Sequence, residues 1–235
     1  MKRALVISRQ AIFDAIGLKE SNFGEYSGKI GDSFYSLEPL LASRHTCEKN
    51  SDYLQIIPYI TLMNSDTREV FVYTRGKAGD EGRLRDKVSI GVGGHIDTIP
   101  NSKTTFLEIL VMEALREIEE EVGIKYSEMD PAEYATIKNS LMEMAPQYSY
   151  IYNNTDEVGK VHFGVSIVIS VTNKDLGALE EEHITNTKWM TIRDLIDAYG
   201  SGELELEAWA KIVMFNVNNV FSSGLPIVPA TGEYS

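Results

Sequence analysis

The chain has 235 residues, and its 22 Lys and Arg against 35 Asp and Glu give a formal net charge of −13. This acidity argues against a protein that coats a nucleic-acid polymer, because that role needs a basic surface. The single cysteine, Cys47, excludes a disulfide framework and a cysteine zinc site, and no apolar run approaches the roughly 18 residues of a membrane helix.

The first 50 residues are predicted to form an extension that packs on the rest of the chain. The basic N-terminus precedes a short apolar stretch without a small-residue cleavage site, so we expect no secretory signal and a cytoplasmic protein. The segment ALVIS (4–8) is typical of a short strand, and glycines interrupt the residues that follow it. No linker rich in Pro or Ser precedes residue 51, where the main domain is expected to begin.

The remainder of the chain mixes strands and helices without regular alternation. Two apolar runs joined by the turn-rich segment NSDTR (64–68) predict a β-hairpin. The predicted strands span 53–63, 69–75, 88–96, 148–152, 161–172 and 187–191, and the predicted helices span 104–122, 131–144, 192–200 and 205–221. This mixture indicates an α+β fold with a mixed sheet, organised as a main domain over 51–202 and a C-terminal helix and tail over 203–235.

The predicted helix over 104–122 concentrates carboxylates along one edge. At about 100° per residue, its apolar side chains form one stripe that must face a core. The stripe consists of Leu107, Val111, Leu115, Ile118 and Val122. The acids Glu113, Glu117, Glu120 and Glu121 fall together on the neighbouring arc, whereas Glu119 points to the other side of the stripe. This pattern alone leaves two explanations open, a solvated helix face or carboxylates that share a hard cation such as Mg²⁺.

A longer motif around these acids resembles the signature of the Nudix hydrolases. Its second half, Arg-Glu-apolar-x-Glu-Glu-x-Gly-apolar, is matched at every specified position, by Arg116, Glu117, Ile118, Glu120, Glu121, Gly123 and Ile124. The segment GVGGHI (91–96) resembles the glycine pair that ends the strand before this box, and Glu108 stands where the family's upstream glutamate belongs. The resemblance implies a Nudix-like α/β/α sandwich with a mixed sheet.

The loop ahead of the helix departs from the family pattern. Gly94 and Glu108 are separated by 13 residues where the family has five, so the segment DTIPNSKTT (97–105) resembles a loop that contains an insertion of eight residues. We expect this insertion to lie at the mouth of the site and to restrict the shape of the substrate. Glu108 would be a metal ligand by the resemblance, but Thr105 and Glu108 also have the spacing of a capping box, which we favour.

The resemblance implies roles for individual residues. In the family, carboxylates of the second half hold one to three divalent ions against a diphosphate while water attacks phosphorus. Carried over, Glu120 and Glu121 are metal ligands, and Glu117 is a ligand or the base that orients the water. Arg116 would hold Glu117 by a bidentate hydrogen bond. Gly93 would offer its carbonyl to the metal, or it is a glycine that only the turn requires.

Several residues outside the box have a functional and a structural interpretation. A later acid that completes the metal site would come from Glu180, Glu181 and Glu182, unless these belong to a solvated loop. The basic side chains that could meet substrate phosphates, unless their loop is merely soluble, are Arg75, Lys77, Arg83, Arg85 and Lys87. The alternating Tyr148, Tyr150 and Tyr152 fit a core or a base-stacking surface. We expect His95 and His162 to be structural and Cys47 to be a buried small residue.

These inferences predict a hydrolase that uses Mg²⁺ or Mn²⁺ to cleave a pyrophosphate bond in a nucleoside diphosphate linked to another moiety. The alternatives on the same fold are a non-catalytic nucleotide-binding module, which usually lacks box carboxylates, and a diphosphate isomerase, which needs another acid or cysteine facing the substrate. The predicted partner is a small nucleotide-like diphosphate, with no nucleic-acid polymer and no membrane, and a homodimer is a compatible assembly.

Overall fold

The computed structural model of the chain describes residues 2–19, 24–76, 86–172, 176 and 184–220. These residues form two compact units. The first unit contains residues 1–59, 93–114 and 141–167, and the second contains residues 60–92, 115–140 and 168–235. The elements over 53–64, 106–122, 131–143 and 162–171 each run from one unit into the other.

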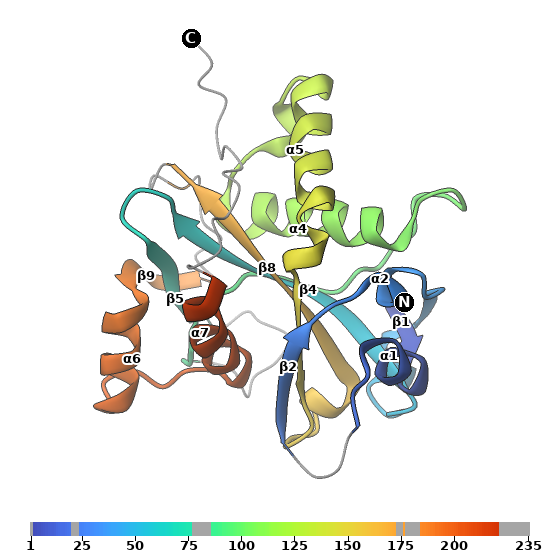
Figure 1. Ribbon diagram of the computed structural model, residues 1–235, viewed down its shortest axis with the longest axis horizontal. Coiled ribbons are helices and arrows are strands. Elements are labelled where there is room, and N and C mark those ends of the chain that lie inside the picture. The colour runs from blue at the N-terminus through green and yellow to red at the C-terminus, as the bar shows by residue number, and fades with distance from the viewer. Residues whose placement is uncertain (1, 20–23, 77–85, 173–175, 177–183, 221–235) are drawn as a thin grey trace. The chain divides into compact units, whose positions relative to one another are not determined.

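The first unit is built on strands that pair in the order β2-β7-β8-β4-β1-β3 (Figure 1). Their bounds are β1 Arg3–Ser8, β2 Glu25–Lys29, β3 Leu40–Ser43, β4 Tyr53–Asn64, β7 Ser149–Asn153 and β8 His162–Val171. Strand β1 lies antiparallel between β3 and β4, and β2 is antiparallel to β7. The three N-terminal strands are therefore hydrogen-bonded into the same sheet as later strands.

Short helices complete the N-terminal part of the first unit. They are α1 Arg9–Ile16, α2 Asp32–Tyr35 and α3 Arg44–Cys47. Aromatic packing ties α2 to later segments, because the Phe34 ring lies 5.5 Å from that of Phe163 and 5.3 Å from that of Phe106. Phe34 is fully buried, so the N-terminal residues contribute core side chains to this unit.

The second unit is organised around β5 (Glu69–Arg75), which pairs with β4, β6 (Val88–Ser89) and β9 (Ile184–Thr191). All three pairings are antiparallel, and an isolated parallel bridge joins Val88 to Leu206. The helices are the second half of α4 (Phe106–Val122), most of α5 (Pro131–Glu143), α6 (Ile192–Gly200) and α7 (Ala208–Val220). A one-turn 3₁₀ helix of this unit spans Tyr126–Glu128, and two others, Ala145–Gln147 and Gly159–Val161, belong to the first unit.

The predicted α+β fold with a mixed sheet is confirmed, and one predicted strand is wrong over most of its length. Within 88–96 the structure has only the two-residue β6 and an isolated bridge from Val92 to Ile60. The carbonyl of Gly91 accepts hydrogen bonds from the Tyr73 hydroxyl (2.8 Å) and the Ser89 hydroxyl (3.0 Å). The Gly91 carbonyl is thus bonded by side chains and not by a neighbouring strand. The apolar pattern of the sequence does not predict such contacts.

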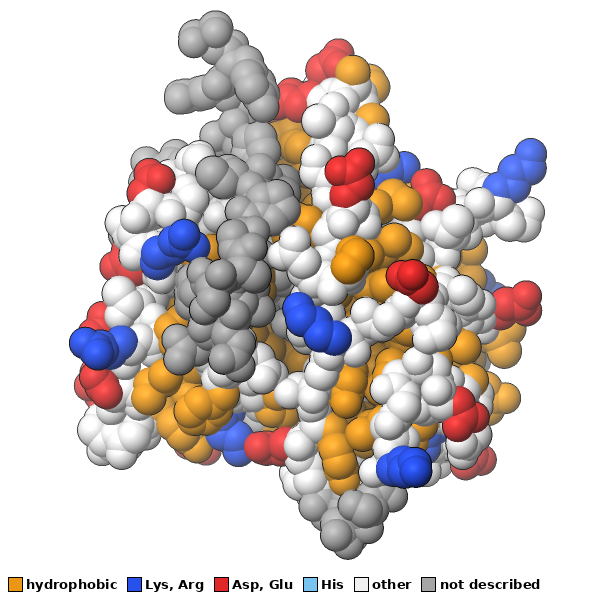
Figure 2. Space-filling model, viewed as in Figure 1, with side chains coloured by type: hydrophobic (Ala, Val, Ile, Leu, Met, Phe, Trp, Pro, Cys, Tyr) orange, Lys and Arg blue, Asp and Glu red, His pale blue; other side chains and the backbone are white. Residues whose placement is uncertain are grey.

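On the face shown in Figure 2, the basic side chains stand singly among acidic and neutral ones. Among the helices of the described residues, none is both long and apolar enough to cross a membrane.

Candidate functional site

Helix α4 begins with the capping box that its sequence predicts. The Thr105 amide donates to a carboxylate oxygen of Glu108 (3.1 Å), and the Glu108 amide donates to the Thr105 hydroxyl oxygen (3.2 Å). This reciprocal pair satisfies amides that have no partner within the helix. The structure therefore assigns Glu108 a capping role in the first turn.

The apolar face of α4 is buried as the periodicity predicts. Val111, Leu115, Ile118 and Val122 are at most 1% exposed, and Leu107 is half-buried. The helix ends at Val122, and the next residue, Gly123, has a φ of 76° in the left-handed region and an amide that donates to the Glu119 carbonyl (3.2 Å). A helix terminus of this kind favours glycine, so Gly123 is explained by the backbone alone.

The acids of the predicted arc differ in exposure. Glu113 and Glu117 are buried, at 7% and 6% exposed, whereas the side chain of Glu120 is 55% exposed. Burial of a carboxylate is costly unless a cation or hydrogen-bond donors compensate. For Glu117 the compensation includes the guanidinium of Arg116.

Arg116 contacts two carboxylates of α4. Its Nη2 donates to Glu117 Oε1, and its Nη1 donates to Glu120 Oε2. The predicted contact between Arg116 and Glu117 is present, and its bidentate form stays a prediction. Because Arg116 contacts both acids, Glu117 and Glu120 lie on the same side of α4.

Glu119 lies apart from this group and has a structural partner. Its carboxylate accepts hydrogen bonds from the Ser127 amide (2.8 Å) and from the Ser127 hydroxyl. Partial burial raises its pKa, but these hydrogen bonds and the charge of Lys125 outweigh burial and bring the pKa below its ordinary value. Glu119 therefore anchors the segment that follows the helix.

Glu121 is half-buried and lies within electrostatic range of a tyrosine on β5. Burial raises the pKa of Tyr73, Arg75 lowers it, and the carboxylates of Glu121 and Glu207 raise it further. The carboxylate of Glu121 thus contributes to the raised pKa of Tyr73.

The acids of α4 suit a hard cation by their chemistry, and Arg116 contacts two of them, Glu117 and Glu120. Within the described residues, no three His, Cys, Asp or Glu side chains converge in a way that would hold an ion. Glu120 would have to leave Arg116 to become a ligand. Its exposed side chain can do so at small cost, because exposed ion pairs contribute only about 0–1 kcal/mol.

Gly93 belongs to the first unit and is required by close backbone packing. A Cβ built on this residue would lie 2.0 Å from the Pro58 carbonyl oxygen on β4. No side chain fits there, so a steric cause accounts for this glycine. Its predicted contribution of a carbonyl to a metal stays a prediction.

The two histidines of the first unit form a pair. His162 Nδ1 lies 2.7 Å from the Val158 carbonyl, and its Nε2 lies 3.1 Å from Nε2 of His95. Because a carbonyl only accepts, Nδ1 of His162 carries the proton, and in the neutral ring its Nε2 accepts from His95. The pair joins the start of β8 to the segment 91–96, which contains His95. This contact agrees with the structural role expected of both histidines.

Other candidates have structural partners or lie outside the described residues. Glu180, Glu181, Glu182, Lys77, Arg83 and Arg85 lie outside the residues that the structure describes. Lys87 pairs with Glu205 at 3.2 Å. Tyr148 and Tyr152 are core residues, Tyr150 stacks on Phe163 at 5.7 Å, and Cys47 is 4% exposed.

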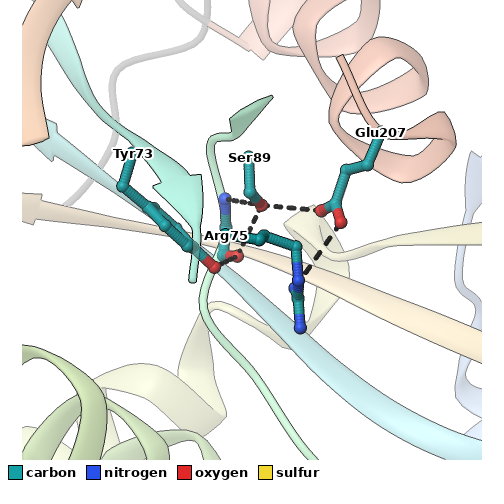
Figure 3. Close-up of polar contacts among 5 residues, drawn as sticks. Tyr73, Arg75, Ser89 and Glu207 are labelled. Carbon is teal, nitrogen blue, oxygen red and sulfur yellow. Dashed lines mark hydrogen bonds and ion pairs between the residues drawn. The ribbon is translucent and has the colours of Figure 1, made fainter. Parts of the chain in front are cut away.

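Arg75 belongs to a cluster that the sequence did not indicate. Figure 3 shows Tyr73, Arg75, Ser89 and Glu207 drawn together in the second unit. Glu207 Oε1 accepts from the Ser89 hydroxyl at 2.6 Å, and its Oε2 lies 3.5 Å from Arg75 Nη1. Glu207 precedes α7 in an amphipathic stretch predicted to be helical, where an acid is expected to face solvent. Its 4% exposure does not follow from that pattern.

The chain is similar to known proteins both in sequence and in the path of its backbone. The chain is 28% identical over 204 residues to Protein YmaB of Bacillus subtilis (strain 168), a match that covers 86% of this chain and 87% of YmaB. The crystal structure of Tm1382, a candidate Nudix hydrolase, matches with a TM-score of 0.66 at 19% identity, covering 94% of this chain and all of that one. A NUDIX hydrolase from Alicyclobacillus acidocaldarius gives a TM-score of 0.47 at 16% identity over 74% of this chain and 97% of its own.

No family model matches the sequence. At 19% identity the likeness to Tm1382 concerns the path of the backbone, and a shared fold does not fix a shared activity. The chain has the fold of a Nudix hydrolase.

Proposed function

We propose that the protein is a Nudix-type hydrolase that cleaves a pyrophosphate bond in a nucleoside diphosphate linked to another moiety, with Mg²⁺ or Mn²⁺. The observation that carries this proposal is the buried carboxylate of Glu117, contacted by Arg116 on the helix that matches the Nudix box. A chain that needed only a solvated helix face would not bury an acid and bind it to arginine.

Glu120 and Glu121, with Glu117, are the residues that would hold the cation. Their oxygens are the ligands that Mg²⁺ prefers. A bound divalent ion neutralises charge that develops on a diphosphate and acidifies water. To hold the ion, Glu120 would have to exchange its contact with Arg116 for the ion, which its 55% exposed side chain permits.

Glu117 and Arg116 act as a unit in this proposal. Arg116 limits the rotation of the Glu117 carboxylate through a charge-assisted hydrogen bond. Oriented in this way, Glu117 is a ligand or the base that accepts a proton from the attacking water. The small substrate, the cytoplasmic location and the homodimer stay predictions.

A phosphate-release screen, coupled to a phosphatase that frees phosphate from the monophosphate products, tests the proposal. The protein would be incubated with nucleoside diphosphate sugars, dinucleoside polyphosphates and nucleoside triphosphates, with Mg²⁺ and with a chelator. We expect metal-dependent cleavage of a pyrophosphate bond in the first group. Tight nucleotide binding without turnover on any substrate would instead support the non-catalytic alternative, in which the acids of α4 serve recognition only.

A further inference from the structure

Strand β3 forms an open edge of the sheet in the first unit. It pairs with β1 and is the last strand in the order β2-β7-β8-β4-β1-β3. Strand β2 ends this order on the other side, and it carries the charged residues Glu25 and Lys29. Charged side chains on an outer strand hinder its pairing with another chain. The sequence of β3, LLAS, contains no charge, so the β3 edge lacks this protection.

The hydrogen bonds between β1 and β3 show which backbone groups of β3 point outward. Hydrogen-bonded and non-hydrogen-bonded pairs alternate along an antiparallel ladder. The Arg44 amide donates to the Lys2 carbonyl at 3.1 Å, and counting pairs from there makes Leu5 and Leu41 a non-hydrogen-bonded pair. Consistently, the Leu5 amide points away from β3 and donates to the Ile96 carbonyl at 2.7 Å. The amide and the carbonyl of Leu41 therefore point to the open edge.

The residues on either side of Leu41 limit what the edge offers. Pro39 has no N–H, so only its carbonyl can take part. Ser43 is a non-hydrogen-bonded partner of Arg3, and its amide also points outward. Its carbonyl is used, because Ser43 is the N-cap of α3 and an N-cap carbonyl accepts the first bond of its helix. Two donors, the amides of Leu41 and Ser43, and two acceptors, the carbonyls of Pro39 and Leu41, are left, and no hydrogen bond within the described part of the chain reaches them.

We propose that the β3 edge binds the β3 edge of a second copy of this chain, antiparallel about a two-fold axis at Leu41. In this register the two Leu41 residues exchange two hydrogen bonds, and each Ser43 amide donates to the Pro39 carbonyl of the other copy. The missing N–H of Pro39 then faces the Ser43 carbonyl that α3 already occupies. A shift by two residues in either direction would leave the amide or the carbonyl of Leu41 without a partner. An edge that complements itself in this way gives a closed dimer.

Leu40 is the exposed apolar side chain that this register covers. Its exposed fraction is 58%. The register places it opposite Ala42 of the second copy, in a non-hydrogen-bonded pair whose side chains approach closely. Ala42 packs against the buried cluster of Ala4, Val6 and Cys47 in its own copy. Leu40 would therefore extend a small apolar cluster of the other chain, and a large side chain opposite a small one fits this close approach.

The charges that flank β3 suit an antiparallel partner. The exposed Glu38 lies before the strand, and the basic Arg44, His45 and Lys49 follow it. Lys49 Nζ lies 3.1 Å from His45 Nε2, and both side chains are exposed. In the proposed register Glu38 faces Arg44 of the second copy, close to His45. Opposite charges across paired strands favour the pairing, whereas a parallel arrangement would place like charges side by side.

Sedimentation velocity of the whole protein over a concentration series tests the interface. A strand of four residues is too short to bury the roughly 1,200–2,000 Å² of a stable interface, so we expect a dimer that dissociates on dilution. Leu40→Lys replaces the covered leucine by a charge and should raise the dissociation constant about tenfold or more. Tyr53→Lys is the matched control, because Tyr53 is 38% exposed on β4, two strands from the edge, and should dimerise like the parent.

Circular dichroism establishes that both variants are folded. A parent that stays monomeric at every concentration would overturn the proposal. An unchanged dissociation constant in Leu40→Lys would overturn it too. The interface does not involve the acids of α4, so its test does not depend on whether the protein hydrolyses a diphosphate.

Cross-linking tests the register. In a Cys47→Ala background, Leu40→Cys protein and Ala42→Cys protein would be mixed and oxidised. Because these positions face each other across the interface, the mixture should give a disulfide-linked dimer with one chain of each kind. Each variant alone should give much less, because neither position faces its own copy. No cross-link in the mixture, or equal cross-linking of each variant alone, would overturn this register.

Discussion

Glutamates within one helix of this protein perform different tasks because their neighbours differ. Glu108 caps the first turn, Glu119 binds Ser127, and Glu117 is buried against Arg116. Helical spacing alone is enough to separate Glu119 from the arc of acids. It does not reveal Ser127 as a partner, because that contact depends on how the chain turns after the helix.

The hydrogen bonds to Glu119 predict a pH-dependent contribution to stability. Its pKa is lowered in the folded protein, so its contribution is present above the unfolded value of about 4.3 and is lost as pH falls through the folded pKa. At pH 7, Glu119→Gln should lower the free energy of unfolding by about 1 kcal/mol. Urea titrations of both proteins at pH 7 and near pH 3.5 should show the difference shrinking at the lower pH. A difference that grows with acidification would contradict this account.

If Glu108 only caps the helix, its negative charge should be needed neither for stability nor for turnover. Glutamine also serves at the third position of a capping box, so Glu108→Gln should keep both stability and turnover close to the parent. Thr105→Ala, which removes the hydroxyl that accepts from the Glu108 amide, should cost about 1 kcal/mol of stability, with Thr105→Ser as its control. A large loss of turnover in a stable Glu108→Gln protein would instead indicate a metal ligand.

At the scale of elements, the sequence predicts the long periodic segments and the short strands β1 and β7, and it misses the other short elements of the N-terminal part. Helix α4 and strands β4, β5 and β8 agree with their predicted ranges to within a few residues. The five elements β2, β3, α1, α2 and α3 are four to eight residues long and do not follow from the sequence pattern. Such short elements depend on tertiary pairing, as when β2 takes its register from β7. The predicted strand over 88–96 is also shorter than expected, because the Gly91 carbonyl bonds the Tyr73 hydroxyl, a contact that depends on tertiary structure.

Close packing at Gly93 predicts that alanine is not tolerated there. The added Cβ would meet the Pro58 carbonyl oxygen at 2.0 Å, and relieving such an overlap moves backbone, at a cost of about 1–3 kcal/mol or more. Thermal unfolding of Gly93→Ala without metal should show a clear loss of stability. Gly200→Ala is the control, because nothing lies within 4 Å of its Cβ position. Parent-like stability of metal-free Gly93→Ala would contradict the steric explanation.

At the scale of the molecule, the N-terminal residues are joined to later segments by strand pairing and by aromatic packing. The match to Tm1382 covers 94% of the chain, and the uncovered 6% of 235 residues is about 14 residues. The matched fold therefore includes most of the first 50 residues. The boundary drawn at residue 50 stays a prediction, because the compact unit that contains residues 1–59 also contains 93–114 and 141–167.

Removal of residues 1–50 should prevent stable folding of what remains. The truncation would strip β1 from β4 and β2 from β7 and would remove the buried Phe34. Unpaired edges and an opened core favour aggregation. Circular dichroism and gel filtration of the truncated chain should show loss of cooperative unfolding or aggregation. A soluble fragment that begins near residue 50 and unfolds cooperatively would show that the extension is an independent module.

The central claim is that the carboxylates of α4 hold a divalent ion for pyrophosphate hydrolysis, and Glu120→Gln tests it most directly. The change preserves shape and removes one negative charge from a side chain that is 55% exposed, so the fold should persist. The measurement is turnover at saturating Mg²⁺ on a diphosphate that the parent hydrolyses, with Glu128→Gln, an exposed acid beyond the helix, as the control. We expect Glu128→Gln to match the parent and Glu120→Gln to lose roughly a hundredfold or more, since metal stabilisation of the transition state is commonly worth several kcal/mol. Equal turnover of the two variants would contradict the claim.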